Sequence, residues 1–220
     1  MSGPAFDGIA ERIGRLGPVP FADYVELALY GSHGFFATGA GAGRRADFIT
    51  SPEVGPLFGA VVARALDAEW ERLGQPDPFV VVEAGAGRGA LAEAVLASGP
   101  SCAPALRYLC AERSPVLRAA IADLLPVEPA ANVLGGVGEE DDDRELVVGQ
   151  QTGPVVAVLD DLPATMFTGV ILANELLDNV PFLLLERSTE GWDEVRVGAD
   201  GERLAEVLVG ASPDLAAEAT

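Results

Sequence analysis

The stretch FVVVEAGAGRGALAEAVL, residues 79–96, predicts a buried strand, a tight glycine turn and a helix in immediate succession. Four apolar residues precede Glu83, and three glycines then alternate with other residues before a helical apolar pattern begins. Glycine lets the backbone turn sharply and lets a ligand approach it closely, and the first N–H groups of a helix have no partner inside the helix. Such a unit is typical of nucleotide-binding α/β proteins.

Two ligand classes use a glycine turn of this kind. Gly85, Gly87 and Ala90 fit the G-x-G-x-x-G/A pattern of dinucleotide-binding proteins, which keeps an NAD-linked oxidoreductase open as an alternative. S-adenosylmethionine binding instead uses an acidic residue two positions before the first glycine, followed by G-x-G-x-G, and EAGAGRG (83–89) matches this pattern in full. The glycines expected beneath the ligand are Gly85, Gly87 and Gly89.

Glu83 favours the second ligand class. A carboxylate at the strand end repels the two phosphates of a dinucleotide, whereas it attracts the ammonium and sulfonium of S-adenosylmethionine. Glu112, at the end of the next apolar run (106–111), is placed to accept hydrogen bonds from two ribose hydroxyls. It would serve NAD equally well, so it does not discriminate between the two. A tight turn that binds no ligand is the structural alternative.

Apolar runs and helical patterns alternate through the middle of the chain, which predicts a mainly parallel sheet with right-handed crossovers. The expected strands are 79–82, 106–111, 155–159 and 169–173, and the expected helices between them are 90–97 and 115–125. A short amphipathic helix is also expected within 1–17, with Ile9, Ile13 and Leu16 at helical spacing, and further helices are expected over 21–30 and 56–73. After residue 181 the pattern favours an antiparallel meander and a frayed tail over 211–220.

These elements predict an α/β protein with a Rossmann-like sheet. The expected parts are an N-terminal helical cap and lid segment (1–74), a cofactor-binding core (75–182) and a small β meander with its tail (183–220), packed together as one compact unit.

The composition narrows the choice of partners. The net charge of −20 argues against a nucleic-acid partner, which would require a basic surface. It fits a basic protein or peptide partner, and the favoured alternative is acidity that serves only solubility. No apolar run approaches the roughly 20 residues of a membrane span, and no secretory pattern begins the chain, so we expect a cytoplasmic protein. Two cysteines and one histidine do not complete a conventional zinc site, so no metal is expected.

Four segments between residues 17 and 182 carry a family resemblance: GPVPFADYVELALYGSHGFF, RADFITSPEVGPLFGAVVA, VVEAGAGRGALAEAVL and VILANELLDNVPF. In these segments the chain resembles the MidA-type proteins, a family of class I methyltransferases related to the mitochondrial complex I assembly arginine methyltransferase. The resemblance implies an S-adenosylmethionine pocket above the strand ends. Residues 47–53 would partly cover this pocket with the hydroxyls of Thr50 and Ser51, although Ser51 could equally serve as a helix cap.

The resemblance also implies where the methyl acceptor would bind. Asn174 and Glu175 follow the fourth expected strand, at the position where class I methyltransferases address the acceptor atom. For an arginine acceptor, Glu175 is the candidate that holds the guanidinium, with Asp178 as a second carboxylate and Asn174 lining the cofactor. In the alternative reading Glu175 and Asp178 only cap the next helix.

Family members continue well beyond the meander, so four strands would leave one edge of this sheet open. A shortened chain, a partner or second copy that covers the edge, or a non-catalytic assembly protein that keeps the fold as a scaffold would each account for this. A homodimer is therefore one expectation.

Overall fold

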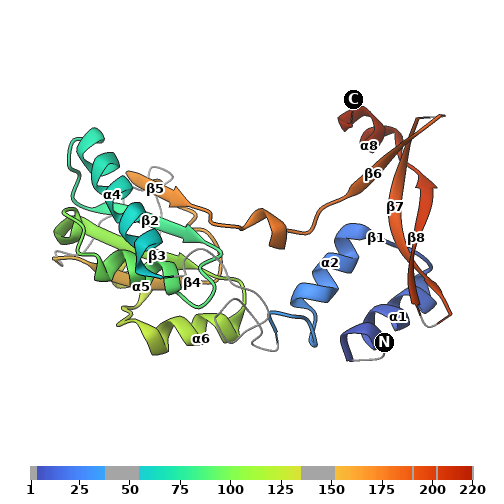
Figure 1. Cartoon of the computed structure of the whole chain (residues 1–220), viewed down its shortest axis with the longest axis horizontal. Helices are drawn as coiled ribbons and strands as arrows, with labels where there is room; N and C mark the ends of the chain where they lie inside the picture. The colour runs from blue at the N-terminus through green and yellow to red at the C-terminus, as the bar shows by residue number, and fades with distance from the viewer. Residues whose placement is uncertain (1–3, 38–54, 135–151, 190, 202, 220) are drawn as a thin grey trace, which may run out of the picture. The chain divides into compact units, whose positions relative to one another are not determined.

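The strand that precedes the glycine turn lies inside a four-stranded parallel sheet in the computed structural model (Figure 1). The strand order is β4-β3-β2-β5. The strands are β2 (Phe79–Ala84), β3 (Leu106–Ala111), β4 (Val155–Leu159) and β5 (Gly169–Leu172). Every residue of β2 and β3 is buried, as expected for central strands covered on both faces. The structure describes residues 4–37, 55–134, 152–189, 191–201 and 203–219.

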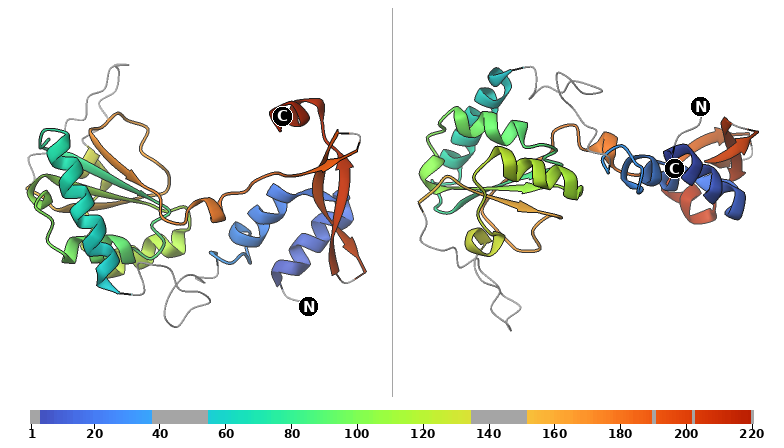
Figure 2. Two further views of the ribbon diagram at one scale, coloured as in Figure 1. Left: turned by 45° about the horizontal axis from the view of Figure 1, so that its top comes forward. Right: turned by 90° about the horizontal axis from the view of Figure 1, so that it is seen from below.

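Helices cover both faces of this sheet (Figure 2). One face packs against α4 (Pro56–Arg72), α5 (Ala90–Ala97) and α6 (Pro115–Leu124), and the other against the short helix α7 (Ala130–Leu134). Helix α4 approaches α5 closely at Gly59, where an added methyl group would lie 2.3 Å from the Cβ of Ala94. The larger core lies on the α4–α6 side and includes Leu66, Tyr108 and Ile121.

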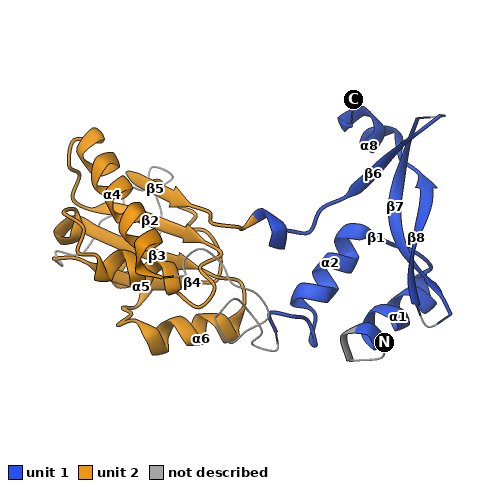
Figure 3. Cartoon of the chain, in the orientation of Figure 1, with its two compact units in different colours: residues 1–38, 177–220 blue, residues 39–176 orange. Residues whose placement is uncertain are grey.

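The two ends of the chain together form a second unit (Figure 3). Its elements are α1 (Pro4–Leu16), β1 (Val19–Pro20), α2 (Phe21–Tyr30), β6 (Leu184–Ser188), β7 (Gly191–Asp200), β8 (Arg203–Gly210) and α8 (Pro213–Glu218). The long strand β7 pairs antiparallel with β6, β8 and β1, which confirms the predicted meander. Ile9 and Ile13 of α1 pack with Val19 and Val197 in the core of this unit.

The division into units differs from the expected boundaries. Unit 2 is Gly39–Leu176, and unit 1 combines Met1–Thr38 with Leu177–Thr220. Helix α4, expected in the N-terminal cap, belongs to unit 2 because Ala63 and Leu66 pack into the core of the parallel sheet. The first two helices join the meander instead, because the two-residue strand β1 pairs with β7.

Two local features differ from what the sequence pattern indicates. Leu16, at helical spacing with Ile9 and Ile13, is exposed, whereas those two residues are buried. The tail, expected to fray, forms α8, because the side chain of Ser212 accepts a hydrogen bond from the N–H of Leu215 and a proline occupies the first turn.

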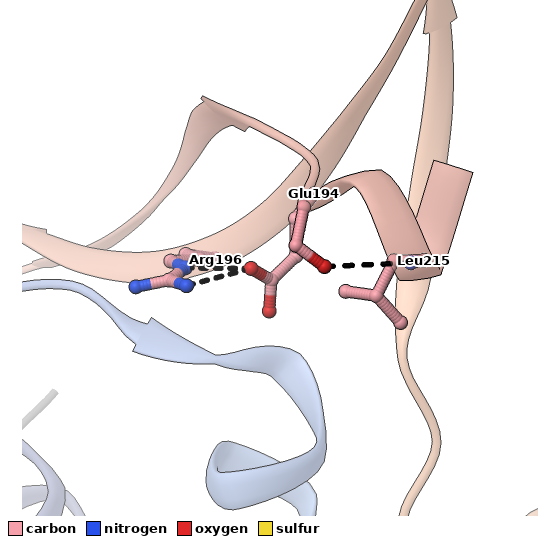
Figure 4. A network of polar contacts seen from close by, with 4 residues as sticks. Glu194, Arg196 and Leu215 are labelled. Atoms are coloured by element: carbon pink, nitrogen blue, oxygen red, sulfur yellow. Dashed lines mark hydrogen bonds and ion pairs between the residues drawn. The ribbon is translucent and has the colours of Figure 1, made fainter. Parts of the chain in front are cut away.

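A partly buried ion pair lies on β7 close to this cap (Figure 4). The guanidinium of Arg196 donates from Nε and Nη2 to one carboxylate oxygen of Glu194, at 2.9 and 2.7 Å. Residues two apart on a strand share one face of the sheet, so Glu194 and Arg196 lie side by side, opposite the buried face of Val195 and Val197. The pair satisfies a carboxylate that the fold removes from water.

None of the described helices is both long and apolar enough to cross a membrane.

Two helical glycines provide a test of the α4–α5 packing. Gly59→Ala should destabilise the protein by about 1–2 kcal/mol, because its methyl group would overlap Ala94 and force the helices apart. Gly14→Ala in α1 is the matched control, since no described atom lies within 4 Å of the position that its methyl group would take, and it should stabilise by about 0.5–1 kcal/mol through helix propensity. Urea unfolding measures both changes, and equal stabilisation by the two variants would contradict the close contact.

Candidate functional site at the strand ends

The glycine turn has a left-handed backbone, which produces the sharp turn that the sequence predicts. Gly85, Gly87 and Gly89 adopt φ values of +72°, +58° and +83°, in the left-handed region that side chains rarely allow. A side chain at Gly85 would also meet Leu176, whose Cδ1 lies 2.8 Å from the position of an added Cβ, whereas no described atom lies within 4 Å at Gly87. The backbone at Gly87 can therefore be approached by a ligand.

Most N–H groups of the turn already have acceptors within the protein. The N–H groups of Gly85 and Ala86 donate to the carbonyl oxygen of Ala111, at 2.8 and 3.2 Å, and that of Gly89 donates to Ala86. The N–H of Gly87 donates to the carboxylate of Glu112 at 2.9 Å. A diphosphate needs such groups as donors, so it would have to compete with these acceptors and with a nearby carboxylate. The turn is poorly suited to a dinucleotide.

Glu112 connects the glycine turn to the loop after β3. One carboxylate oxygen accepts from Gly87, and the other accepts from the N–H of Ser114 at 2.8 Å. Arg118 fixes the same loop by donating to the carbonyl oxygens of Glu112 and Arg113, both at 2.8 Å. Burial raises the pKa of the Glu112 carboxyl, while the two backbone N–H donors act in the opposite direction. Each oxygen keeps a second lone pair, so contact with ribose hydroxyls stays a prediction.

Glu83 lies in the interior at the end of β2, with 4% of its surface exposed. The hydroxyl of Tyr108 donates to its Oε2 at 2.7 Å. Burial raises the pKa of Glu83 to about 7; the hydrogen bond from Tyr108 opposes this rise, and the negative charge of Glu112 adds to it. The sequence did not single out Tyr108, although a tyrosine inside a predicted buried strand needs a hydrogen-bond partner for its hydroxyl.

The chain continues after β5 past the point on the sheet edge where Glu83 lies. Leu172 is the register partner of Glu83, so Asn174 and Glu175 follow at the same edge of the sheet. Asn174 is half-buried. Glu175 is exposed and has φ +53°, a conformation that is uncommon outside glycine and that often occurs at functional sites.

Asp178 belongs to a different part of the fold from Glu175. It is an exposed residue of the short 3-10 helix η2 (Leu177–Asn179), which is part of unit 1. Within that unit, the hydroxyl of Tyr30 donates to the carbonyl oxygen of Asn179 at 2.9 Å, and the rings of Phe21 and Phe182 lie 5.2 Å apart. The structure therefore does not join the two candidate carboxylates in one unit.

Some candidate residues lie outside the described part of the chain. These include Thr50 and Ser51, together with the rest of the expected lid segment 47–53. Among the described residues, no group of three histidine, cysteine or acidic side chains could hold a metal ion. Cys102 and Cys110 are buried free thiols.

The strand order, the glycine turn and the paired acids define an α/β domain whose candidate ligand site lies at the carboxyl ends of parallel strands. A sequence family described as "Putative S-adenosyl-L-methionine-dependent methyltransferase" matches residues 61–219. The chain belongs to this family, which confirms the resemblance carried by its motifs.

Solved structures agree with this assignment. A Burkholderia thailandensis protein bound to S-adenosyl-homocysteine superposes with a TM-score of 0.72 at 26% identity, over 99% of this chain and 55% of its own. A native crystal structure from the same organism gives the same TM-score and identity, over 100% of this chain and 54% of that one. The predicted class I methyltransferase fold is confirmed.

Curated relatives are named as arginine methyltransferases. The mitochondrial protein arginine methyltransferase NDUFAF7 of Danio rerio is 27% identical over 88% of this chain and 46% of its own length. The Drosophila melanogaster homolog is 44% identical over 39% of this chain and 20% of its own. The chain thus spans about half the length, or less, of the relatives that it matches.

Replacing Glu83 should change stability in a pH-dependent way. Because burial raises the folded-state pKa above the unfolded value, the folded chain binds this proton more tightly. The stability that this tighter proton binding contributes is fully present below the pKa of the unfolded state, and it is lost as pH rises through about 7. Glu83→Gln should therefore be about 2 kcal/mol more stable than the wild type at pH 8, and nearly equal to it at pH 5.

Urea unfolding at the two pH values measures this difference. Glu71→Gln, at an exposed position of α4, is the control and should show no such pH dependence. If Glu83→Gln is no more stable than the wild type at pH 8, the result contradicts a buried Glu83 carboxylate that ionises with a raised pKa.

Proposed function

We propose that the chain binds S-adenosylmethionine and transfers its methyl group to an arginine of a partner protein. The observation that carries the proposal is the position of Glu83, buried at the end of β2 beside a glycine turn whose N–H groups are largely occupied. A carboxylate in that place suits a cationic ligand and disfavours a diphosphate. Family membership and the relative bound to S-adenosyl-homocysteine support the same ligand.

Each acid has a distinct role in this proposal. Glu83 faces the ammonium end of the ligand, Glu112 receives the ribose hydroxyls, and the backbone at Gly87 lies against the ligand. The bound cofactor supplies an electrophilic methyl group. The chain's contribution is then to position the acceptor nitrogen in line with that group and to exclude water.

The arginine acceptor rests on the names of the relatives and on charge. The NDUFAF7 proteins are named protein arginine methyltransferases, and the net charge of −20 attracts a basic partner over long range. Glu175 is the carboxylate proposed to hold the guanidinium, because it follows β5 at the strand-end edge, is exposed and has a strained backbone. Asp178 is the second proposed carboxylate, Asn174 is proposed to line the cofactor, and Thr50 and Ser51 are proposed to cover it.

A second candidate function is a non-catalytic assembly protein that retains the methyltransferase fold. The open edge of the sheet favours it, since β5 has a single strand neighbour among the described residues and Ile171 on this strand is exposed. The same edge supports a homodimer or another partner. The cytoplasmic location stays a prediction, and the NDUFAF7 relatives are named as mitochondrial.

Calorimetric titration with S-adenosyl-homocysteine tests the cofactor site. The wild type should bind, Glu83→Gln should bind about tenfold more weakly at pH 8, and Glu83→Lys should not bind, because its ammonium repels that of the ligand. Glu71→Lys, at the exposed position of α4, is the matched charge reversal and should bind like the wild type.

Two results would count against S-adenosylmethionine binding at this site. A flat titration of the wild type at high protein concentration would remove the proposal, and a change of NADH fluorescence on mixing would favour the oxidoreductase instead.

Transfer of a labelled methyl group tests the acceptor site. With tritiated S-adenosylmethionine and a cell extract, the wild type should label protein arginine. Glu175→Gln should reduce this labelling by at least tenfold while keeping the affinity for S-adenosyl-homocysteine, because the amide no longer balances the guanidinium charge. Glu186→Gln, at an exposed position of β6, is the control. Cofactor binding without any transfer by the wild type would favour the assembly protein.

A further inference from the structure

The hydroxyl of Tyr108 occupies a fixed position beneath the candidate site. Tyr108 lies in the middle of β3, opposite Val81 of β2, and its side chain is fully buried in the larger core. Because the ring is held by close packing, the hydroxyl cannot move far from the Oε2 of Glu83, 2.7 Å away. The family resemblance and the glycine motif assign no role to this residue.

The environment of Glu83 makes this one hydrogen bond important. From β3 and the loop after it, Tyr108, Cys110 and Glu112 interact electrostatically with the carboxylate, and the negative charge of Glu112 opposes its ionisation. On β5 its register partner is Leu172, and α4 and α5 pack apolar side chains into the core on the same side. Among the residues that the structure describes, no basic side chain forms an ion pair with Glu83.

We propose that Tyr108 is a positioning residue for the methyl donor, whose hydroxyl favours the ionised form of the Glu83 carboxylate and keeps it in one orientation. A phenolic O–H that donates to a carboxylate favours its charged form. The hydrogen bond engages Oε2 and leaves Oε1 for the ammonium end of the ligand. This inference rests on the proposed function.

The inference predicts a pH-dependent affinity. Burial raises the pKa of Glu83 to about 7, so the carboxylate gains a proton as pH falls through this value and loses its attraction for an ammonium group. Removing the Tyr108 hydroxyl takes away the donor that favours the charged form. The midpoint of the affinity profile should then move to higher pH.

The experiment measures the dissociation constant of S-adenosyl-homocysteine between pH 5.5 and 8.5. The wild-type affinity should weaken below about pH 7. Tyr108→Phe should shift the midpoint upward by about one pH unit, which makes binding about fivefold weaker at pH 7 and about tenfold weaker at pH 5.5. Tyr24→Phe, which removes a hydroxyl from α2 in the other unit, should leave the profile unchanged.

A second ligand distinguishes a positioning role of Tyr108 from a general effect on the structure of the site. 5′-Methylthioadenosine keeps the adenosine part but has no ammonium group. Its affinity should be the same in the wild type and Tyr108→Phe at every pH, whereas a general distortion of the site would weaken both ligands. In a Glu83→Gln background, Tyr108→Phe should have no effect on the pH profile.

The outcomes distinguish this inference from the proposed function. If the wild type does not bind S-adenosyl-homocysteine at any pH, the proposed function fails. If the wild type binds and Tyr108→Phe has the same profile, the positioning role is overturned and the proposed function stands. Should Tyr108→Phe not fold, Glu83→Asp replaces it, because a carboxylate one methylene shorter retreats from the fixed hydroxyl. The same upward shift then supports the role, and an unshifted profile overturns it.

Discussion

Glu83 and Glu112 are two buried carboxylates at the ends of the neighbouring parallel strands β2 and β3. Their need for hydrogen-bond donors constrains the structure around the candidate site. Glu112 accepts hydrogen bonds from the glycine turn after β2 and from the loop after β3, so it ties the two strand ends together. Glu83 lies on the adjacent strand and is held by Tyr108. Because both groups are removed from water, each depends on donors that the fold places within hydrogen-bond distance.

This arrangement costs stability in the absence of a ligand. The negative charge of Glu112 opposes the ionisation of Glu83, and burial raises the pKa of both groups. The fully buried strands β2 and β3 and the packed helices around them offset that cost. A cationic ligand would relieve it, which explains why a site that is unfavourable alone suits S-adenosylmethionine in the proposed function.

The unit formed by the chain termini constrains part of the proposed acceptor residues. The block from Asn174 to Phe182 begins in the parallel-sheet unit and ends in the unit formed by the chain termini, where Tyr30 and Phe21 hold its later part. Glu175 is therefore positioned by β5, whereas Asp178 is positioned by η2 and α2. The two candidate carboxylates are therefore fixed by different units of the fold.

The sequence by itself determined the local elements around the site. Its apolar runs and glycines predicted α5, β3 and β4 with their observed bounds, and the glycine turn with Glu83 and Glu112 at the strand ends. These features depend on short-range patterns, namely strand periodicity, turn chemistry and helix spacing. The capped helix α8 could also have been predicted, since Ser212 followed by proline is an ordinary helix start.

Only the tertiary structure decided which elements share a core. Periodicity shows that one face of α4 is apolar but not that the face packs on the parallel sheet, and a two-residue strand such as β1 becomes visible only through its pairing with β7. The same holds for the site. The sequence identified the acid at position 83, but the hydroxyl that controls its charge comes from a neighbouring strand 25 residues away, and that contact exists only once the sheet has formed.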